Sequence, residues 1–291
     1  MKPAVFQYVA PRTREEALEA VRRFGSDGKI LAGGQSLVPL MAMRLARPAT
    51  IIDLNRIPDL AYIRAARGGL SIGAMTRQRT AEMHRLVIER LPLLAEALRW
   101  VGHAQIRTRG TIGGSLAHAD PSAELPAVAA VLGGRFVVAS TRGERIVDVS
   151  QFFTGYLTTA LQAHEILVEV QLAAPPAGAG WAFQEIARRH GDFAIAGVAA
   201  LVRLDGDRRC TEARLAFTGV GPGPVRASDA EAYLAGKRLG NATVEEAGRI
   251  AQAALDPDSD IHASAAYRKH VAGVLAARAL RQAAERAKSQ G

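Results

Sequence analysis

The sequence predicts an α+β fold in two domains, and three observations lead to this prediction. The chain has 291 residues, 48% of them hydrophobic and 22% charged, which is typical of a folded protein long enough for two hydrophobic cores. Short apolar runs alternate with helix-period segments from residue 3 to residue 172. After a linker rich in Pro, Ala and Gly at 173–180, strand-like segments are followed by helical ones, the order typical of a small α+β domain.

The N-terminal residues predict a compact βαβ unit. We expect a strand at 3–8, a helix at 13–24, a strand at 29–32, a helix at 37–45 and a strand at 50–54. Thr13 is placed to cap the first helix, with Glu16 closing a capping box. Pro39 fits the first turn of the second helix, where the missing N–H is tolerated. The unit puts a Gly-Gly pair between a strand end and a helix start, a position that favours an anion.

The remaining elements follow from the same patterns of apolar spacing and turn residues. Hairpins are expected to join 61–66 to 70–74 and 136–139 to 145–149, and a strand at 165–172 ends this part of the chain. Helices are expected at 76–87, 92–100 and 122–132. After the linker we expect strands at 181–188, 194–204 and 209–218, then helices near 228–236, 243–255 and 263–287.

Two glycine segments, Ala32–Ser36 and Gly110–Ser115, give the strongest functional signal. Each sets a Gly-Gly pair beside small polar residues, so the backbone can turn with positive φ and let a ligand approach its N–H groups. Successive N–H groups form an anion-binding concavity, and two such turns could close on the diphosphate of a dinucleotide. Taken alone, either pair is better explained as an ordinary strand connection. Neither matches the G-x-G-x-x-G fingerprint or the P-loop.

Composition and spacing argue against several other functions. The net charge of +9 comes mostly from Arg residues spread along the chain, without the continuous basic block of a nucleic-acid-binding surface. No apolar run is long enough for a membrane span and the N-terminus lacks a signal peptide's apolar core, so we expect a cytoplasmic location. The single cysteine, Cys210, cannot hold an iron–sulfur cluster, and no two histidines have zinc-helix spacing. We expect no metal and no catalytic residue in this chain.

Longer stretches around the two glycine segments resemble the medium, FAD-binding subunit of the molybdenum hydroxylase family, which includes aerobic carbon monoxide dehydrogenase and xanthine dehydrogenase. The stretches that carry the resemblance are 31–41, 103–107, 110–121, 189–194, Tyr267-Arg268 and Ala277-Arg278. They cover almost the whole chain, and their order and spacing are specific. One departure is Ser115, where many relatives have Asn; the swap keeps a hydrogen-bonding group.

The resemblance implies a two-part FAD-binding domain of the vanillyl-alcohol-oxidase (PCMH) type over 1–175, with subdomains of about 1–57 and 58–175. It implies a small C-terminal α+β domain of the carbon monoxide dehydrogenase flavoprotein type, with an antiparallel sheet and helices, over 176–291. The residues that it implies at the cofactor are Ala32, Gly33, Gly34, Gln35, Ser36, Val101, Thr111, Ile112, Gly113, Gly114, Ser115, Asp120, Glu124, Ile166, Leu167 and Phe193.

The same resemblance implies a role for each group of these residues. The two glycine segments would bind the FAD diphosphate and flank the ribityl chain. Glu124, with Asp120 as a second candidate, would hold ribityl or ribose hydroxyls. Val101 would lie near the cofactor and Phe193 close to the isoalloxazine ring. Ile166 and Leu167 would lie beside the flavin or the adenine.

By the same resemblance, the chain would be one subunit of a heterotrimer. Electrons would pass from a molybdenum–pterin site in a large subunit, through [2Fe–2S] clusters in a small subunit, to FAD in this chain and then to an external acceptor. A dimer of heterotrimers, reaching the inner membrane only peripherally through the complex, would be the assembly. A stand-alone FAD oxidoreductase and a non-redox nucleotide-binding module are the alternatives. The substrate and the acceptor (quinone, NAD or oxygen) stay open, because that chemistry lies outside this chain.

Overall fold

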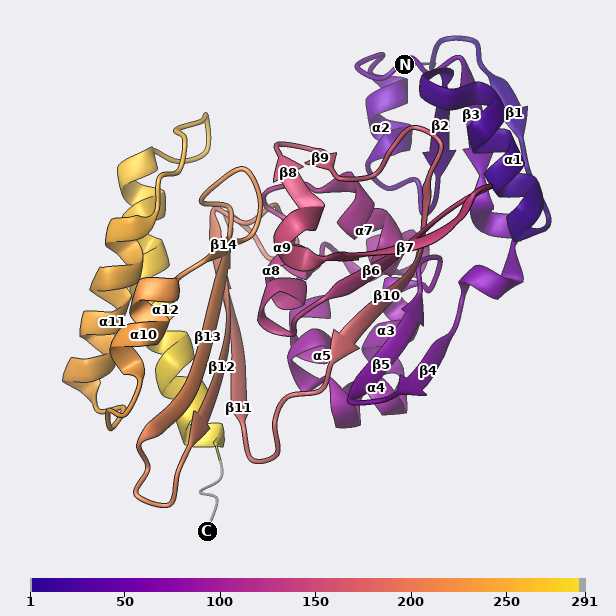
Figure 1. Cartoon of the computed structure of the whole chain (residues 1–291). Coiled ribbons are helices and arrows are strands. Elements are labelled where there is room, and N and C mark those ends of the chain that lie inside the picture. Colours follow the sequence, from indigo (N-terminus) through magenta and orange to yellow (C-terminus); the bar gives the residue numbers. More distant parts are fainter. Residues whose placement is uncertain (1, 288–291) are drawn as a thin grey trace.

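The computed structural model describes residues 2–287, and the outermost residues of both expected domains lie outside this range. Figure 1 shows a small N-terminal unit, a central sheet flanked by short helices, and a C-terminal sheet covered by long helices. The central and C-terminal sheets are antiparallel and are combined with helices, as the α+β prediction requires, whereas the small N-terminal sheet is parallel. None of the helices between residues 2 and 287 combines the length and the hydrophobicity that crossing a membrane requires.

The N-terminal unit is a three-stranded parallel sheet with strand order β1-β3-β2. Its elements are β1 (Gln7–Val9), α1 (Arg14–Phe24), β2 (Gly28–Leu31), α2 (Leu37–Ala42) and β3 (Thr50–Asp53), with 3₁₀ turns at Gly25–Asp27, Leu54–Arg56 and Pro58–Leu60. Thr13 caps α1 by accepting a hydrogen bond from the N–H of Glu16 at 3.1 Å. The expected capping box is not formed, because the Glu16 carboxylate accepts from the N–H of Arg12 instead (2.7 Å).

The central sheet is antiparallel, with strand order β4-β5-β10-β6-β7. Its strands are β4 (Ile63–Ala66), β5 (Gly69–Gly73), β6 (Arg135–Ser140), β7 (Gly143–Asp148) and β10 (Ile166–Ala173), and a small pair is formed by β8 (Phe153–Gly155) and β9 (Thr158–Thr159). The helices are α3 (Gln78–Met83), α4 (Arg85–Arg90), α5 (Pro92–Leu98), α6 (Ala104–Arg109), α7 (Ile112–His118), α8 (Glu124–Val131) and α9 (Val149–Phe152).

Two features of this helical layer differ from the expectations. The single helix expected over 76–87 is divided into α3 and α4, because His84 takes an extended conformation and its ring nitrogen caps α4 by accepting from the N–H of Leu86 at 3.3 Å. The second glycine segment, expected as a turn, is instead helical: Ile112 to His118 form α7, and α6 directly precedes it. Thr111 stabilises this glycine-containing helix by capping its first turn.

The C-terminal part places four antiparallel strands against long helices. The strands are β11 (Gly180–Ile186), β12 (Ala196–Leu204), β13 (Cys210–Thr218) and β14 (Val225–Arg226), in that order, and the helices are α10 (Ser228–Leu234), α11 (Asn241–Ala254) and α12 (Ala265–Arg286). Figure 1 shows the helices on one face of this sheet, with α5 and α8 on the other.

Side chains of both parts form one continuous apolar core at this second face. Phe183 and Leu201 of the C-terminal sheet belong to the same buried cluster as Leu94 of α5. Glu96 of α5 also accepts a hydrogen bond from the N–H of Phe183 (3.1 Å) and pairs with Arg286 (2.6 Å). The two parts are therefore packed against each other through a shared apolar core and polar contacts.

Candidate dinucleotide site

The two glycine segments lie in direct contact, although more than seventy residues separate them in the sequence. A Cβ atom added at Gly33 would lie 2.4 Å from the carbonyl oxygen of Arg109 and 2.8 Å from Cα of Gly110. A Cβ atom at Gly114 would lie 3.1 Å from Cβ of Ala32. Glycine is thus required at position 33 so that the two backbones can meet, and the structure brings the segments together as the dinucleotide hypothesis requires.

Two side chains that the sequence analysis missed hold this contact in place. Asn55, just after β3, donates from Nδ2 to the carbonyl of Ala32 at 2.8 Å. Arg77 donates from Nη2 to Oδ1 of Asn55 at 2.6 Å and from Nη1 to the carbonyl of Arg109. One guanidinium therefore ties the first glycine segment to the residues that precede the second. The sequence offers no signal for it, because the bonded residues lie 22 and 32 positions apart.

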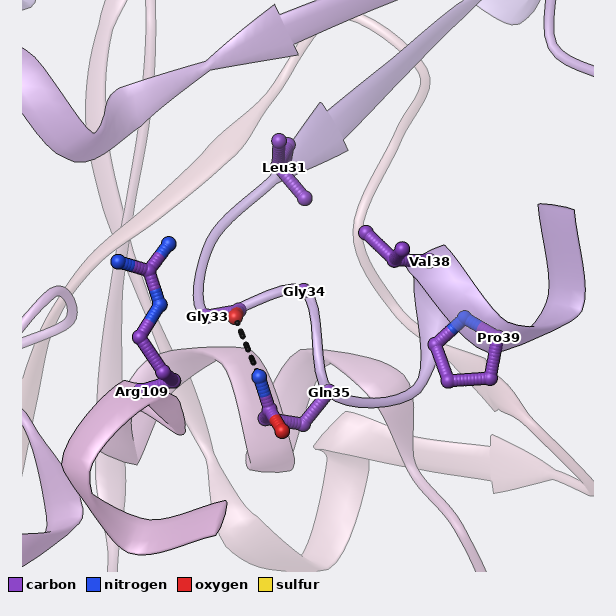
Figure 2. A pocket seen from close by; sticks show the side chains of 7 residues that line it. All are labelled: Leu31, Gly33, Gly34, Gln35, Val38, Pro39 and Arg109. Carbon is purple, nitrogen blue, oxygen red and sulfur yellow. Dashed lines mark hydrogen bonds between the residues drawn. The ribbon is translucent and has the colours of Figure 1, made fainter. Parts of the chain in front are cut away.

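The first glycine segment lines a cavity of about 360 Å³. Its walls are Leu31, Gly33, Gly34, Gln35, Val38, Pro39 and Arg109, shown in Figure 2. Gly34 has φ of +76°, which turns the chain between β2 and α2. Within residues 2–287, the N–H groups of residues 33–36 donate to no other group, so they remain available to a ligand.

Arg109 supplies a cation at the same cavity. Figure 2 shows it on one side of the first glycine segment, with Val38 and Pro39 of α2 on the other. Its guanidinium forms no ion pair among the described residues. Free amide donors and an unpaired guanidinium are the groups that bind phosphate oxygens, and the apolar side chains suit a flat ring or a methylene chain. This set fits a dinucleotide diphosphate.

The second glycine segment offers fewer free amides than the first, because most of its N–H groups already have partners. The N–H of Ile112 donates to Thr76 (2.9 Å) and that of Gly113 donates to Ala74 (2.8 Å). The N–H of Gly114 donates to the Thr111 side chain at 3.0 Å. Gly113 is explained by packing, since a Cβ there would lie 2.4 Å from Cβ of Ala74.

Of this segment, the Thr111 N–H and the Ser115 hydroxyl are the groups without a partner among residues 2–287. These two groups lie at the start of α7, beside the first glycine segment. In this segment, the free donors therefore belong to Thr111 and Ser115, whereas the N–H groups of Gly113 and Gly114 already have partners.

The two acidic candidates lie between α7 and α8. Ala119 takes a left-handed conformation (φ 52°) that ends α7, and Asp120 then accepts from the N–H of Ser122 at 2.9 Å. Glu124 opens α8 and is only 7% exposed. Burial raises the pKa of Glu124 to about 7, and the nearby charge of Asp120 acts in the same direction. Burial also lowers the pKa of His118, so this neighbouring ring is neutral at neutral pH.

Four further apolar candidates, Val101, Phe193, Ile166 and Leu167, differ in their exposure. Val101 is 9% exposed and its carbonyl accepts from Arg107 at 3.0 Å, so its position is fixed by a buried cation. Phe193 is 73% exposed at the domain boundary. Ile166 and Leu167 are buried in the two apolar clusters on either side of β10. The structure thus brings neither Ile166 nor Leu167 to an open surface.

Metal chemistry has no support in the described residues. Among residues 2–287, no three His, Cys, Asp or Glu side chains are grouped closely enough to bind a metal ion. Cys210 is buried and burial raises its pKa to about 11, so it is an inert thiol.

Comparison with known proteins assigns the chain to a family. Residues 4–175 match the sequence model described as the FAD binding domain in molybdopterin dehydrogenase. Residues 181–283 match the CO dehydrogenase flavoprotein C-terminal domain. The resemblance seen in the sequence is thereby confirmed.

Individual relatives match over nearly their whole length. The chain is 41% identical to subunit alpha of the 6-hydroxypseudooxynicotine dehydrogenase complex of Paenarthrobacter nicotinovorans, over 99% of this chain and 97% of that protein. It is 39% identical to caffeine dehydrogenase subunit beta of a Pseudomonas species, over 98% and 97%. A solved structure of carbon monoxide dehydrogenase from Hydrogenophaga pseudoflava superposes with a TM-score of 0.96 at 40% identity, over 99% of this chain and 100% of that one. The chain therefore belongs to the molybdenum hydroxylase family, as its medium, FAD-binding subunit.

Proposed function

We propose that this chain holds the FAD diphosphate at residues 33–36 and Arg109, and relays electrons from iron–sulfur clusters of a partner subunit to an external acceptor. The observation that carries the proposal is the cavity where unpaired amides and an unpaired guanidinium meet. A flavin supplies the redox chemistry when bound, so the chain needs no nucleophile or base of its own.

The other proposed contacts follow the path from this cavity to the domain boundary. Thr111 and Ser115 would complete the diphosphate site from the start of α7. Glu124, with Asp120, would take the hydroxyls of the ribityl chain or ribose. Val101 and Phe193 would lie at the ring. The roles of Ile112, Gly113 and Gly114 would be to let the segments pack closely, and contact of Ile166 and Leu167 with the cofactor stays a prediction.

The partner chains are proposed from the relatives and from the composition. Curated relatives are named as a complex subunit, a subunit beta and a medium chain, which supports partners in general. With Cys210 as its single cysteine, this chain cannot hold [2Fe–2S] clusters itself. We propose a small [2Fe–2S] subunit and a large molybdenum–pterin subunit, arranged as a dimer of heterotrimers in the cytoplasm.

The central test is cofactor binding by an Arg109→Gln variant. The chain is co-purified with its partner subunits, stripped of flavin and titrated with FAD, with visible absorption and dithionite reduction as readouts. Because a charge-assisted hydrogen bond contributes roughly 1.5–3 kcal/mol, we expect affinity to fall about 10- to 100-fold. Arg67→Gln, in the exposed turn between β4 and β5, is the matched control. Unchanged FAD affinity in Arg109→Gln would remove this guanidinium from the site.

The same preparation separates the two alternatives. A stand-alone oxidoreductase would oxidise substrate without any partner chain, whereas the proposed subunit would oxidise nothing alone. A non-redox module would stay colourless, or would bind a nucleotide that dithionite leaves unchanged. Size-exclusion chromatography with light scattering measures the stoichiometry of the complex, and cell fractionation tests its location.

A further inference from the structure

A buried carboxyl at the domain boundary has no hydrogen-bond partner on one of its oxygens. Glu185 of β11 is 8% exposed, and its Oε2 makes no hydrogen bond among the described residues. It lines a cavity of about 170 Å³ together with Trp100 and His190. The Trp100 and His190 rings stack, with centroids 5.8 Å apart and planes inclined by 26°. Trp100 and His190 thus give this cavity a flat aromatic wall, and Glu185 adds a deeply buried carboxyl to its lining.

The C-terminal sheet places Glu185 in one row with Thr218, which contacts the start of α8 in the FAD-binding part. Glu185 pairs with Gly197 of β12, and Gly197 pairs with Thr218 of β13, so the three lie in one row across the sheet. A Cβ at Gly197 would lie 2.8 Å from Cγ2 of Thr218 and 3.5 Å from Cγ of Glu185. Thr218 in turn donates to the carbonyl of Ala123 at 2.7 Å, directly before Glu124.

Burial and the charge of the other carboxyl, Glu124, both disfavour ionisation of Glu185. Burial is the largest cause that raises the pKa of Glu185 to about 9, and the charge of Glu124 raises it further. Arg107 is the cation that favours ionised Glu124, yet its guanidinium already binds Glu82 at 2.9 Å. The other charged or titratable groups around the pair are Asp120, Arg189 and His190. Two such carboxyls cannot both ionise at neutral pH without cost, so they retain at least one proton.

We propose that Glu185, buried without a hydrogen-bond partner on Oε2, is held protonated at the boundary between the two parts of the chain, and that its carboxyl donates a hydrogen bond to an acceptor atom on the edge of a planar ring in the adjoining cavity. The protonated state of Glu185 is a property of the apo chain alone. The ring ligand rests on the proposed function, and two sources have this chemistry: the isoalloxazine ring of FAD and a quinone that accepts its electrons. Above the pH at which Glu185 ionises, the donor is lost and a negative charge replaces it.

The protonated state of Glu185 is tested on the full chain without cofactor. Infrared spectra of protein with ¹³C-labelled glutamate carboxyls are recorded from pH 6 to pH 10. The wild type should show a protonated carboxylic acid band at pH 8, above the pKa of Glu124, that is lost as the pH rises through about 9, and Glu185→Gln should lack that band at pH 8 and above. Glu89→Gln, on the exposed face of α4, should retain it. A wild-type spectrum without the band, or an unchanged band in Glu185→Gln, would overturn the proposal.

The ring ligand is tested on the complex. If the ring is the flavin, FAD affinity of the wild type should fall at least tenfold between pH 7 and pH 10, and that of Glu185→Gln should not. If the ring is a quinone, the KM for menadione should rise at least tenfold between pH 7 and pH 10 in the wild type and not in Glu185→Gln. The FAD affinity should then have the same pH dependence in both proteins. If wild type and Glu185→Gln show the same pH dependence both for FAD affinity and for the KM for menadione, the donor role of Glu185 is refuted. Failure of the wild type to bind FAD at any pH would refute the proposed function. The infrared result on the apo chain would still decide whether Glu185 is protonated.

Discussion

The contact between the two glycine segments can be broken with one methyl group. In Gly33→Ala, the new Cβ would meet the carbonyl oxygen of Arg109 at 2.4 Å and Cα of Gly110 at 2.8 Å. Both are backbone atoms, so no flexible side chain can move aside. The backbone at position 33 does not have positive φ, so alanine adds a steric clash there without conformational strain. The two segments must move apart.

The size of the effect follows from the cost of inserting a methyl group into a packed contact. Such overpacking costs typically about 1–3 kcal/mol, and one kcal/mol lowers Tm by roughly 2–4 °C in a protein of this size. The cavity beside Gly33 would change shape as well, because this residue forms part of its wall. We expect a Tm loss of roughly 2–10 °C, together with a loss of FAD affinity that exceeds the loss of stability.

The assay compares Gly33→Ala with Gly155→Ala in the same complex. A Cβ at Gly155 has no atom within 4 Å, and its φ is ordinary, so that substitution is sterically neutral. Thermal unfolding is followed by far-UV circular dichroism, and FAD binding by quenching of flavin fluorescence. If Gly33→Ala retains the Tm and FAD affinity of Gly155→Ala, the claim that these two segments must touch to form the site is wrong.

Three further substitutions test other contacts. Arg107→Met leaves the buried carboxylate of Glu82 with fewer partners and should lower the free energy of unfolding by roughly 2–4 kcal/mol in urea titrations, while an effect below half a kcal/mol would show that the pair is unimportant. Thr111→Val removes the acceptor of the Gly114 N–H and should cost about 1 kcal/mol, which Thr111→Ser should restore; equal loss in both would exclude a capping role. Hydrogen bonds lower the pKa of Asp260 to about 2, so its stabilisation is present above its ordinary pKa and is lost as pH falls toward 2; the Tm difference between wild type and Asp260→Asn should shrink over that range, and a constant difference would contradict this assignment.

Local sequence signals predicted the elements well where the cause is local. The strand-to-helix passage after Leu31 was predicted because a short strand with apolar residues, a glycine pair and a Pro-containing helix follow one another. The helix starting at Ile112 was missed, since Gly113 and Gly114 lower helix propensity and the Thr111 cap and the packing on Ala74 compensate only in the folded chain. The break at His84 was missed because its extended conformation and the cap formed by its ring nitrogen are seen only in the folded chain.

The site was predictable to the extent that it lies in continuous motifs. Residues 33–36 were found because their composition alone suggests exposed amides. Asn55 and Arg77 were not, because they act on carbonyls far away in the sequence. Glu185 gave no signal either: a carboxyl in a strand is unremarkable until the opposite domain buries it.

The apolar cluster that joins the C-terminal sheet to α5 and α8 also limits how the chain can be divided. Cutting the linker at 173–180 would leave Phe183 and Leu201 on one fragment and the residues that pack against them on the other. If the fragments separated, each would expose a large apolar surface to water. A nicked molecule should therefore stay associated, and either half expressed by itself should aggregate. Gene fusions or splits in this family are better placed outside these residues than at the apparent boundary between the halves.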